Sequence, residues 1–211
     1  MIEFTDVVKS YTQGNKALNG VTMQIEDGEF CFLIGPSGSG KSTIIKLITG
    51  ELKPTSGTVL LDGQDIWSDK KLTRQARFRV GLVFQYPEYQ LFEETVYKDI
   101  AFGPKNMGLS PEEVDRRVRE AAGFVGLTEQ QLEVSPFDLS GGQKQRLTIA
   151  RAIAADPEIL ILDDSASALD FATDAKLRTA IKENCTNMTV FLISQRANTV
   201  KNADRIIVLD D

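Results

Sequence analysis

The chain has 211 residues, a length that suits one large domain or a domain with an inserted lobe. Its 42% hydrophobic and 26% charged residues are ordinary globular usage, which argues against a disordered or fibrous chain. The net charge of −6 and the lack of a long basic run argue against nucleic-acid binding through a general electrostatic face. The absence of histidine excludes histidine metal sites, Ser-His-Asp triads and Cys-His dyads.

Two cysteines, Cys31 and Cys185, lie in or beside apolar strand-like runs. They are interpreted as buried, reduced thiols of a cytosolic protein. No signal peptide opens the chain, and no stretch approaches the roughly 18 apolar residues of a membrane span. Any work at a membrane is therefore expected to go through a partner.

The N-terminal third predicts strands and one helix. Alternating polarity predicts strands over 2–11 and 17–25, and a continuous apolar run predicts a buried strand over 29–34. Apolar residues at helical spacing then predict a helix that ends at Gly50. A short strand is expected over 58–61 and a buried strand over 80–84.

The rest of the chain alternates helices with apolar strands. Residues 93–139 are expected to be helical, with a helix start at Ser110-Pro111, where serine caps and proline takes the first position. Further helices are expected over 143–155 and 174–183, and strands over 159–162, 189–194 and 205–209. This alternation predicts an α/β fold with a parallel sheet and a helical insertion near 87–140.

A glycine-rich loop between the predicted strand 29–34 and its following helix matches the pattern of a phosphate-binding loop. Gly35, Gly40, Lys41 and Ser42 stand at the spacing G-x-x-x-x-G-K-S. Glycines allow successive N–H groups to point at phosphate oxygens, and the helix dipole adds to their field. Lys41 would reach the β- and γ-phosphates of ATP, and Ser42 would offer its hydroxyl to Mg²⁺. The expected nucleotide-binding residues here are Gly35, Ser37, Gly38, Ser39, Gly40, Lys41, Ser42 and Thr43.

A carboxylate at the end of a neighbouring apolar strand should complete the metal site. Asp163 follows the four apolar residues of the predicted strand 159–162 and is the expected Mg²⁺ carboxylate.

The run Leu139-Ser140-Gly141-Gly142-Gln143 resembles the signature motif of the ATPase subunits and domains of ABC transporters. Ser140 and the glycine N–H groups would form an anion site at a helix N-terminus. The resemblance implies that this site faces the γ-phosphate held by a second subunit, so that two chains enclose two ATP molecules head to tail. The partners it implies are a second ABC ATPase subunit, identical or different, and a transmembrane transporter subunit, with no nucleic acid.

Three more positions match the family residue by residue. Tyr11 stands where an aromatic ring stacks on adenine, although a core aromatic is the alternative. Gln85 matches the glutamine that senses Mg²⁺ and the attacking water, and Asp170 matches a loop that crosses the dimer interface. By the same resemblance, Ser140, Gly141, Gly142 and Gln143 contact the nucleotide.

Two catalytic positions depart from the family pattern. Asp164 stands where the family has a glutamate base, and Gln195 stands where it has a histidine. Aspartate is shorter by one methylene, and glutamine donates a hydrogen bond but carries no charge. We therefore predict good ATP binding with slow hydrolysis by the catalytic set Lys41, Gln85, Asp164 and Gln195.

The resemblance implies a P-loop NTPase: a RecA-like parallel sheet core with an N-terminal antiparallel β subdomain and an inserted helical subdomain. The core is expected over 1–86 and 141–211 and the helical subdomain over 87–140, and a truncation is expected at the C-terminal end. The expected location is the cytoplasmic face of the membrane, held there by a partner.

Different parts of the chain resemble different subfamilies. Residues 1–66 resemble the bacterial cell-division ABC ATPase, 80–150 the ATPases of energy-coupling-factor and cobalt importers, and the part from 157 onward multidrug exporters. This mosaic predicts an engineered chimera, with a divergent natural protein as the alternative.

Three functions remain open at this point. The first is a transport motor powered by ATP, and the second is a nucleotide-binding and dimerisation module with little turnover. The third, an ABC ATPase acting on nucleic acid, is disfavoured by the acidic charge and the lack of a second cassette.

Overall fold

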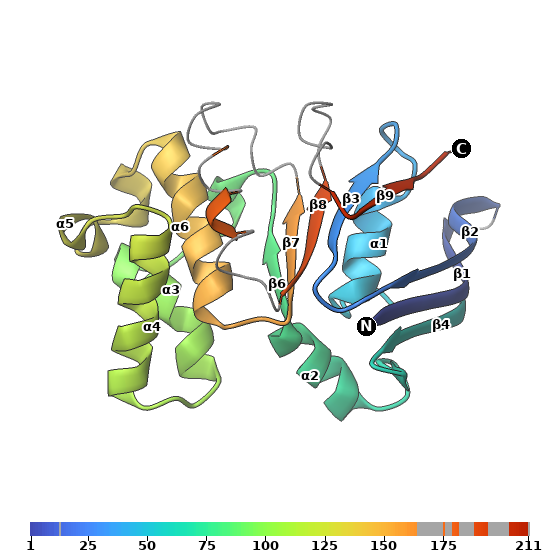
Figure 1. The fold of residues 1–211 in the computed structure, drawn as a ribbon, viewed down its shortest axis with the longest axis horizontal. Coiled ribbons are helices and arrows are strands. Elements are labelled where there is room, and N and C mark those ends of the chain that lie inside the picture. Colours follow the sequence, from blue (N-terminus) through green and yellow to red (C-terminus); the bar gives the residue numbers. More distant parts are fainter. Residues whose placement is uncertain (13, 164–174, 176–178, 182–187, 194–202, 211) are drawn as a thin grey trace. The chain divides into compact units, whose positions relative to one another are not determined.

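The computed structural model describes residues 1–12, 14–163, 175, 179–181, 188–193 and 203–210. The chain divides into two compact units, one of Met1–Val80 with Asn187–Asp211 and one of Gly81–Thr186. Figure 1 follows both along the chain.

The first unit contains an antiparallel sheet in the order β2-β1-β4-β5. In register, Phe4 of β1 faces Met23 of β2 on one side and Val59 of β4 on the other. Phe4 and Val59 are fully buried, so the predicted alternation does place one side of these strands in a core. The strands are β1 (Ile2–Thr12), β2 (Asn15–Ile25), β4 (Ser56–Leu61) and β5 (Gln64–Asp65).

A parallel arrangement, β8-β3-β9, forms the other layer of this unit. Phe32 of β3 pairs with Leu192 on one side and Ile206 on the other. Cys31, Phe32 and Leu33 have no exposed surface, as expected for a strand that reads as a continuous apolar run. The strands are β3 (Phe30–Ile34), β8 (Thr189–Ile193) and β9 (Arg205–Val208).

The described part of the first unit also contains two helices. Helix α1 (Lys41–Ile48) follows β3 and buries Ile44, Ile45, Leu47 and Ile48, as predicted. Helix α2 (Lys70–Arg79) was not predicted, because Lys and Arg dominate it and only Thr73 and Ala76 are buried. Its start is nevertheless marked in the sequence: the Asp69 carboxylate accepts a hydrogen bond from the Lys71 N–H at 3.1 Å.

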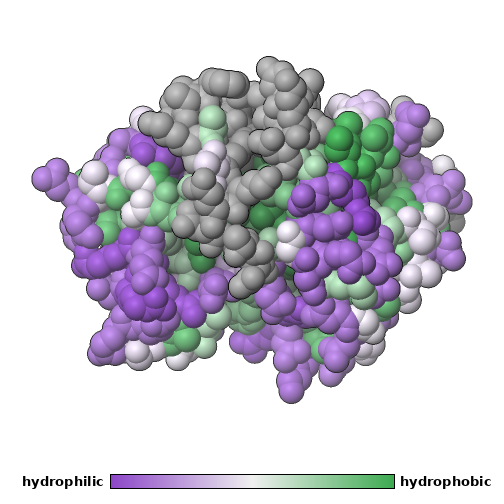
Figure 2. Space-filling model, in the orientation of Figure 1, coloured by the Kyte–Doolittle hydropathy of each residue, from purple (hydrophilic) through white to green (hydrophobic). Residues whose placement is uncertain are grey.

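The described part of the second unit combines two strands with helices. Strand β6 (Val80–Val83), which begins at the last residue of the first unit, lies next to β7 (Ile159–Asp163). Helices α3, α4 and α6 pack against one another. In Figure 2 the face over α4 is hydrophilic, in line with its exposed arginine and glutamate side chains. The helices within residues 81–163 are α3 (Val96–Asn106), α4 (Pro111–Phe124), α5 (Glu129–Leu132), α6 (Gly141–Ala154) and the single 3₁₀ turns η1 (Pro87–Tyr89) and η2 (Pro136–Asp138).

Residues 93–139, expected to be helical, contain several separate helices. The segment breaks after α3 and again after α4, where Gly108 and Gly126 adopt φ of +76° and +72°. Residues other than glycine rarely adopt this left-handed backbone conformation. The two glycines therefore allow the helices to end in tight turns there. The predicted start at Ser110 is confirmed, since its hydroxyl accepts from the Glu113 N–H. Most of the expected helix 174–183 lies outside the described residues.

Candidate nucleotide-binding site

The loop between β3 and α1 has a backbone that requires glycine. Gly38 and Gly40 adopt φ of +92° and +96°. A Cβ atom at Gly40 would lie 2.6 Å from the Ala17 carbonyl oxygen, and one at Gly35 would lie 2.5 Å from that of Leu209. The spacing that predicted a phosphate-binding loop therefore corresponds to a backbone that leaves no room for side chains at Gly35 and Gly40.

The N-terminus of α1 is the electropositive end of this loop. Gly40 is the N-cap residue, and no side chain caps the helix there. The first N–H groups of a helix have no partner within it, and the helix dipole favours an anion beside them. Ser42 is exposed in this first turn, whereas Thr43 is buried.

The Lys41 ammonium lies over the same loop. It donates hydrogen bonds to the carbonyl oxygens of Gly35 at 2.7 Å and Pro36 at 2.5 Å. Ser39 contributes a hydroxyl that is buried and has no hydrogen-bond partner among the described residues. Ser37 is exposed in the same loop. The loop thus holds one cation and several donors in a place that an oxyanion could reach.

Tyr11 of β1 reaches the same helix. Its hydroxyl lies 3.2 Å from the Thr43 Oγ1, and the side chain is 56% exposed. The Lys9 ammonium lies 5.7 Å from the centre of the ring. A core aromatic, the alternative interpretation, would be buried, so the exposed ring favours a stacking surface beside α1.

Two predicted residues of the second unit follow strands of its sheet. Asp163 is the last residue of β7, and Gln85 comes two residues after β6. Both side chains are half-buried. Since β6 and β7 are neighbours, the second unit brings a carboxylate and an amide to adjacent strands.

The signature motif begins α6. The Ser140 hydroxyl accepts from the Gln143 N–H at 3.3 Å, and the Gln143 side chain accepts from the Ser140 N–H at 2.8 Å. This capping box satisfies two backbone donors of the helix start. Leu139 is buried, while Ser140 and Gly141 are exposed and a Cβ at Gly141 would meet open space. Gly142 follows in the first turn and is half-buried.

Three predicted site residues, Asp164, Asp170 and Gln195, lie outside the described residues. The same holds for Cys185, whereas Cys31 is a free, buried thiol.

A buried charged network in the second unit was not predicted from the sequence. Arg151 of α6 donates to the Asp99 carboxylate of α3 at 2.9 Å and to Gln90, in the loop that joins η1 to α3. Asp99 has no exposed surface. The one signal in the sequence is an aspartate inside an otherwise apolar helix face, because a buried carboxylate needs a partner.

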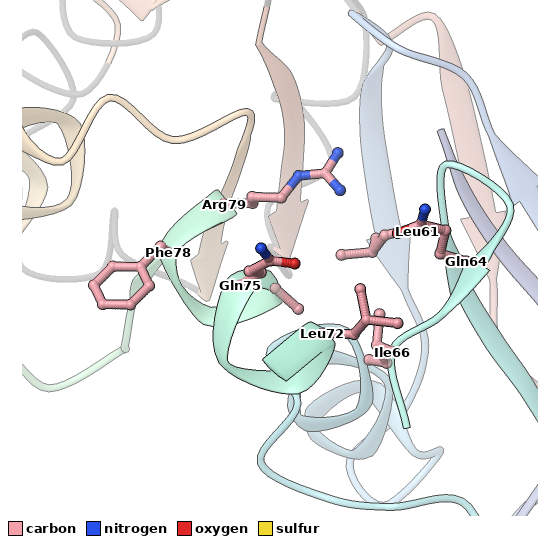
Figure 3. A pocket seen from close by; sticks show the side chains of 8 residues that line it. Leu61, Gln64, Ile66, Leu72, Gln75, Phe78 and Arg79 are labelled. Atoms are coloured by element: carbon pink, nitrogen blue, oxygen red, sulfur yellow. The ribbon is translucent and has the colours of Figure 1, made fainter. Parts of the chain in front are cut away.

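A pocket of about 290 Å³ also lies in the first unit, beside α2 (Figure 3). Its lining residues are Leu61, Gln64, Ile66, Leu72, Gln75, Ala76, Phe78 and Arg79. None belongs to the glycine-rich loop or to another predicted site position. The pocket is therefore separate from the expected nucleotide chemistry.

Comparison with known proteins identifies the class. The family model of ABC transporters matches residues 18–167, so the chain belongs to this family. It is an ABC-type ATP-binding cassette with the P-loop NTPase fold, and an ATP hydrolase by class.

Individual relatives cover nearly the whole chain. The energy-coupling factor transporter ATP-binding protein EcfA2 of Clostridium acetobutylicum is 48% identical, over 100% of this chain and 76% of its own. The EcfA2 of Clostridium perfringens is 49% identical over 92% and 70%. The post-hydrolysis dimeric structure of the cassette MJ0796, bound to ADP and Pi, matches with a TM-score of 0.90 and 33% identity, over 100% and 94%.

The mosaic prediction finds no support in these comparisons. A single relative, the Clostridium acetobutylicum protein, matches across 100% of the chain.

Among the helices that the structure describes, none combines the length and apolar character needed to traverse a bilayer.

Proposed function

We propose that this chain is the ATP-hydrolysing subunit of an energy-coupling-factor type importer, working as a head-to-tail dimer that drives a transmembrane partner at the cytoplasmic face of the membrane. The observation that carries the proposal is the glycine-rich loop ahead of an uncapped helix: Gly35 and Gly40 leave no room for a Cβ atom, and Gly38 has a positive φ. The identity with EcfA2 proteins supports the subfamily.

The proposed binding of ATP follows from the residues around this loop. The N–H groups of 38–43 and the Lys41 ammonium would hold the phosphates, with Lys41 exchanging its two carbonyl acceptors for phosphate oxygens. Tyr11 would stack on adenine through its exposed face. Ser140, Gly141, Gly142 and Gln143 of one chain would cover the γ-phosphate bound by the other.

The available donors fit Mg²⁺. The metal prefers oxygen ligands and keeps several waters, so it needs few protein groups besides the substrate phosphates. Ser42 offers an exposed hydroxyl and Asp163 a carboxylate, and no group of three or more acidic, Cys or His ligands occurs in the part of the chain that the structure describes. When bound, Mg²⁺ would neutralise charge on the β- and γ-phosphates, and Gln85 would sense it.

Catalysis is proposed to be slow. Asp164 would accept the proton of the attacking water, and Gln195 would donate a hydrogen bond to the γ-phosphate. The expected helical subdomain 87–140 and core 1–86 with 141–211 remain part of this proposal.

An exposed aromatic patch is the proposed docking surface for the transmembrane partner. Tyr86, Tyr89, Phe92 and Phe102 are between 43% and 88% exposed, and the Phe92 and Phe102 rings lie edge to face at 4.9 Å. Exposed aromatic side chains are enriched in protein interfaces. This patch includes the segment that follows Gln85.

The test is steady-state Mg²⁺-ATP hydrolysis by the purified chain over a range of protein concentrations. Turnover should rise faster than linearly with protein, because two chains build each site. Lys41→Ala should abolish turnover, and Lys46→Ala in the same helix should not, since Lys46 stands in its last turn. Asp164→Glu should raise turnover by about tenfold or more, as the longer base approaches the water.

A rate equal to that of Lys41→Ala at every concentration would overturn the motor proposal for the chain alone. ATP binding without turnover would then favour the dimerisation module. No gain from Asp164→Glu would refute the account of a base-limited site.

A further inference from the structure

The loop that follows the 3₁₀ turn η1 is held by a buried charged network. We call Arg151, Asp99 and Gln90 the Arg151 clamp. One guanidinium nitrogen of Arg151 donates to Asp99 Oδ1 at 2.9 Å and to the Gln90 carbonyl oxygen at 2.6 Å. A second donates to the Gln90 side-chain oxygen at 2.8 Å.

The clamp joins three pieces of the second unit. While Asp99 Oδ1 binds Arg151 of α6, Asp99 Oδ2 lies 3.3 Å from the Phe92 N–H and 3.4 Å from that of Glu93. One carboxylate of α3 therefore binds the helix on one side and the loop 90–93 on the other. The turn η1 also packs against α6, so the loop contacts this helix at two places.

The composition of the clamp favours positioning over stability. A buried ion pair recovers its desolvation cost only with good geometry, and apolar residues often replace such pairs without loss. Asp99 has no exposed surface, and the buried Nε2 of Gln90 has no hydrogen-bond partner among the described residues. The Arg151 clamp instead fixes the orientation of the loop, because the planar guanidinium donates its hydrogen bonds in set directions.

The two ends of the clamped assembly carry features of the proposed function. At the loop end, Tyr89 is 88% and Phe92 56% exposed. At the other end, the exposed Ser140 caps α6, and Arg151 stands ten residues beyond Gly141, about 15 Å along the helix axis. A hydrogen-bonded helix of this length moves as a rod, so a shift at Arg151 reaches its first turn.

We propose that Arg151 is a positioning residue that fixes the loop 90–93 to α6, so that displacement of the exposed loop moves the helix that begins with the signature motif. The inference rests on the proposed function for its activity readout. It adds a named residue and a mechanical link to the docking surface and the signature helix.

The same helix offers a matched control. Arg146 of α6 is half-buried and donates to the carbonyl oxygens of Gly126 at 2.8 Å and Val125 at 3.4 Å, away from the loop. Arg151→Lys and Arg146→Lys each exchange the fork for a single ammonium. Gln90→Met removes the side-chain acceptor of the clamp and leaves the Asp99–Arg151 pair intact.

The first experiment measures kcat and KM for ATP hydrolysis by the full chain. Arg151→Lys and Gln90→Met should lower kcat by about tenfold with KM within about twofold, because no residue of the phosphate-binding loop changes. Arg146→Lys should leave both constants within about twofold. Equal kcat for all variants and the unmodified chain, or an equal loss for both arginine variants, would overturn the proposal.

The second experiment reads the link without catalysis, by hydrogen exchange of the amides in 141–147. Phe92→Ala disturbs the loop and should speed exchange there in the unmodified chain. In the Arg151→Lys background, Phe92→Ala should not change the exchange rate of these amides any further. In the Arg146→Lys background, Phe92→Ala should still speed their exchange. An undiminished response in Arg151→Lys would refute the link. This readout needs no turnover. A chain without ATPase activity would therefore contradict the proposed function, but hydrogen exchange would still test the link between the loop and α6.

Discussion

At the residue scale, Gly38 and Gly40 of the phosphate-binding loop separate two costs of replacing glycine by alanine. One is the strain of a positive φ, and the other is the steric contact of the added Cβ atom. Both glycines have positive φ, but a Cβ at Gly38 meets nothing within 4 Å, and one at Gly40 would lie 2.6 Å from the Ala17 oxygen and 2.7 Å from Leu18 Cδ2. We expect Gly38→Ala to cost about 1 kcal/mol of unfolding free energy. Gly40→Ala should cost about 2–4 kcal/mol.

Urea denaturation of the two variants measures this difference. Equal losses would show that the loop relaxes around the new methyl group, and the argument from close approach would then fail. Nucleotide affinity should fall further in Gly40→Ala, because the same glycine begins α1.

Cys31 is expected to be chemically inert in the folded protein. Its burial, together with the nearby Glu29 carboxylate, raises the pKa of the thiol from 9.0 to about 12. In a Cys185→Ser background, a disulfide reagent should label Cys31 at pH 8 only as fast as the protein unfolds. Labelling at the rate of a free thiol would contradict the burial.

The same shift gives a pH dependence with a definite sign. Because the folded state keeps its proton at higher pH than the unfolded state, the Cys31 contribution to stability is complete below pH 9.0 and declines as pH rises toward about 12. Comparing the unfolding free energy of Cys31→Ala with that of the parent at pH 8 and pH 10.5 tests this. The gap between them should narrow at the higher pH.

At the element scale, two capping boxes of the second unit separate helix stability from function. Ser140 with Gln143 caps α6, and Thr128 with Gln131 caps α5. Ser140→Ala and Thr128→Ala should each cost about 1 kcal/mol. Only Ser140→Ala should also lower ATP turnover, since Thr128 belongs to no proposed contact with nucleotide. Loss of turnover in both variants would mean that destabilisation alone explains the effect.

The helices also show which local sequence patterns predict a helix and which do not. The cap at Ser110 and the apolar spacing of α1 were recognised, because these patterns lie within one turn or one helix face. Helix α2 was missed, because a hydrophobic pattern needs a buried face and this helix buries only Thr73 and Ala76. Its cap Asp69 was the available signal.

At the scale of the whole molecule, the proposed dimer makes a complementation experiment possible. Gly141→Asp fits sterically and suits the N-terminus of α6, yet it would place a negative charge beside the γ-phosphate bound by the partner chain. Lys41→Ala would disable the other half of each site. Each variant alone should be inactive.

Mixed in equal amounts, the two inactive variants should recover activity. Random pairing makes about half of the dimers mixed, each with one intact site, so about a quarter of the parent rate is expected if sites act independently. No recovery would mean that the phosphate-binding loop and the signature motif of one chain serve the same nucleotide.

The sequence by itself determined the strands β3 and β7, the glycine-rich loop, the signature helix start and the family, since each depends on residues adjacent in the chain. Only the tertiary structure decided that Tyr11 meets Thr43, and that Arg151 meets Asp99 and Gln90 across 52 and 61 residues. A buried ion pair leaves no periodic trace along a sequence, because its partners are chosen by how helices and loops pack. Motifs are therefore legible from the chain alone, whereas the contacts that hold them in place follow from the fold.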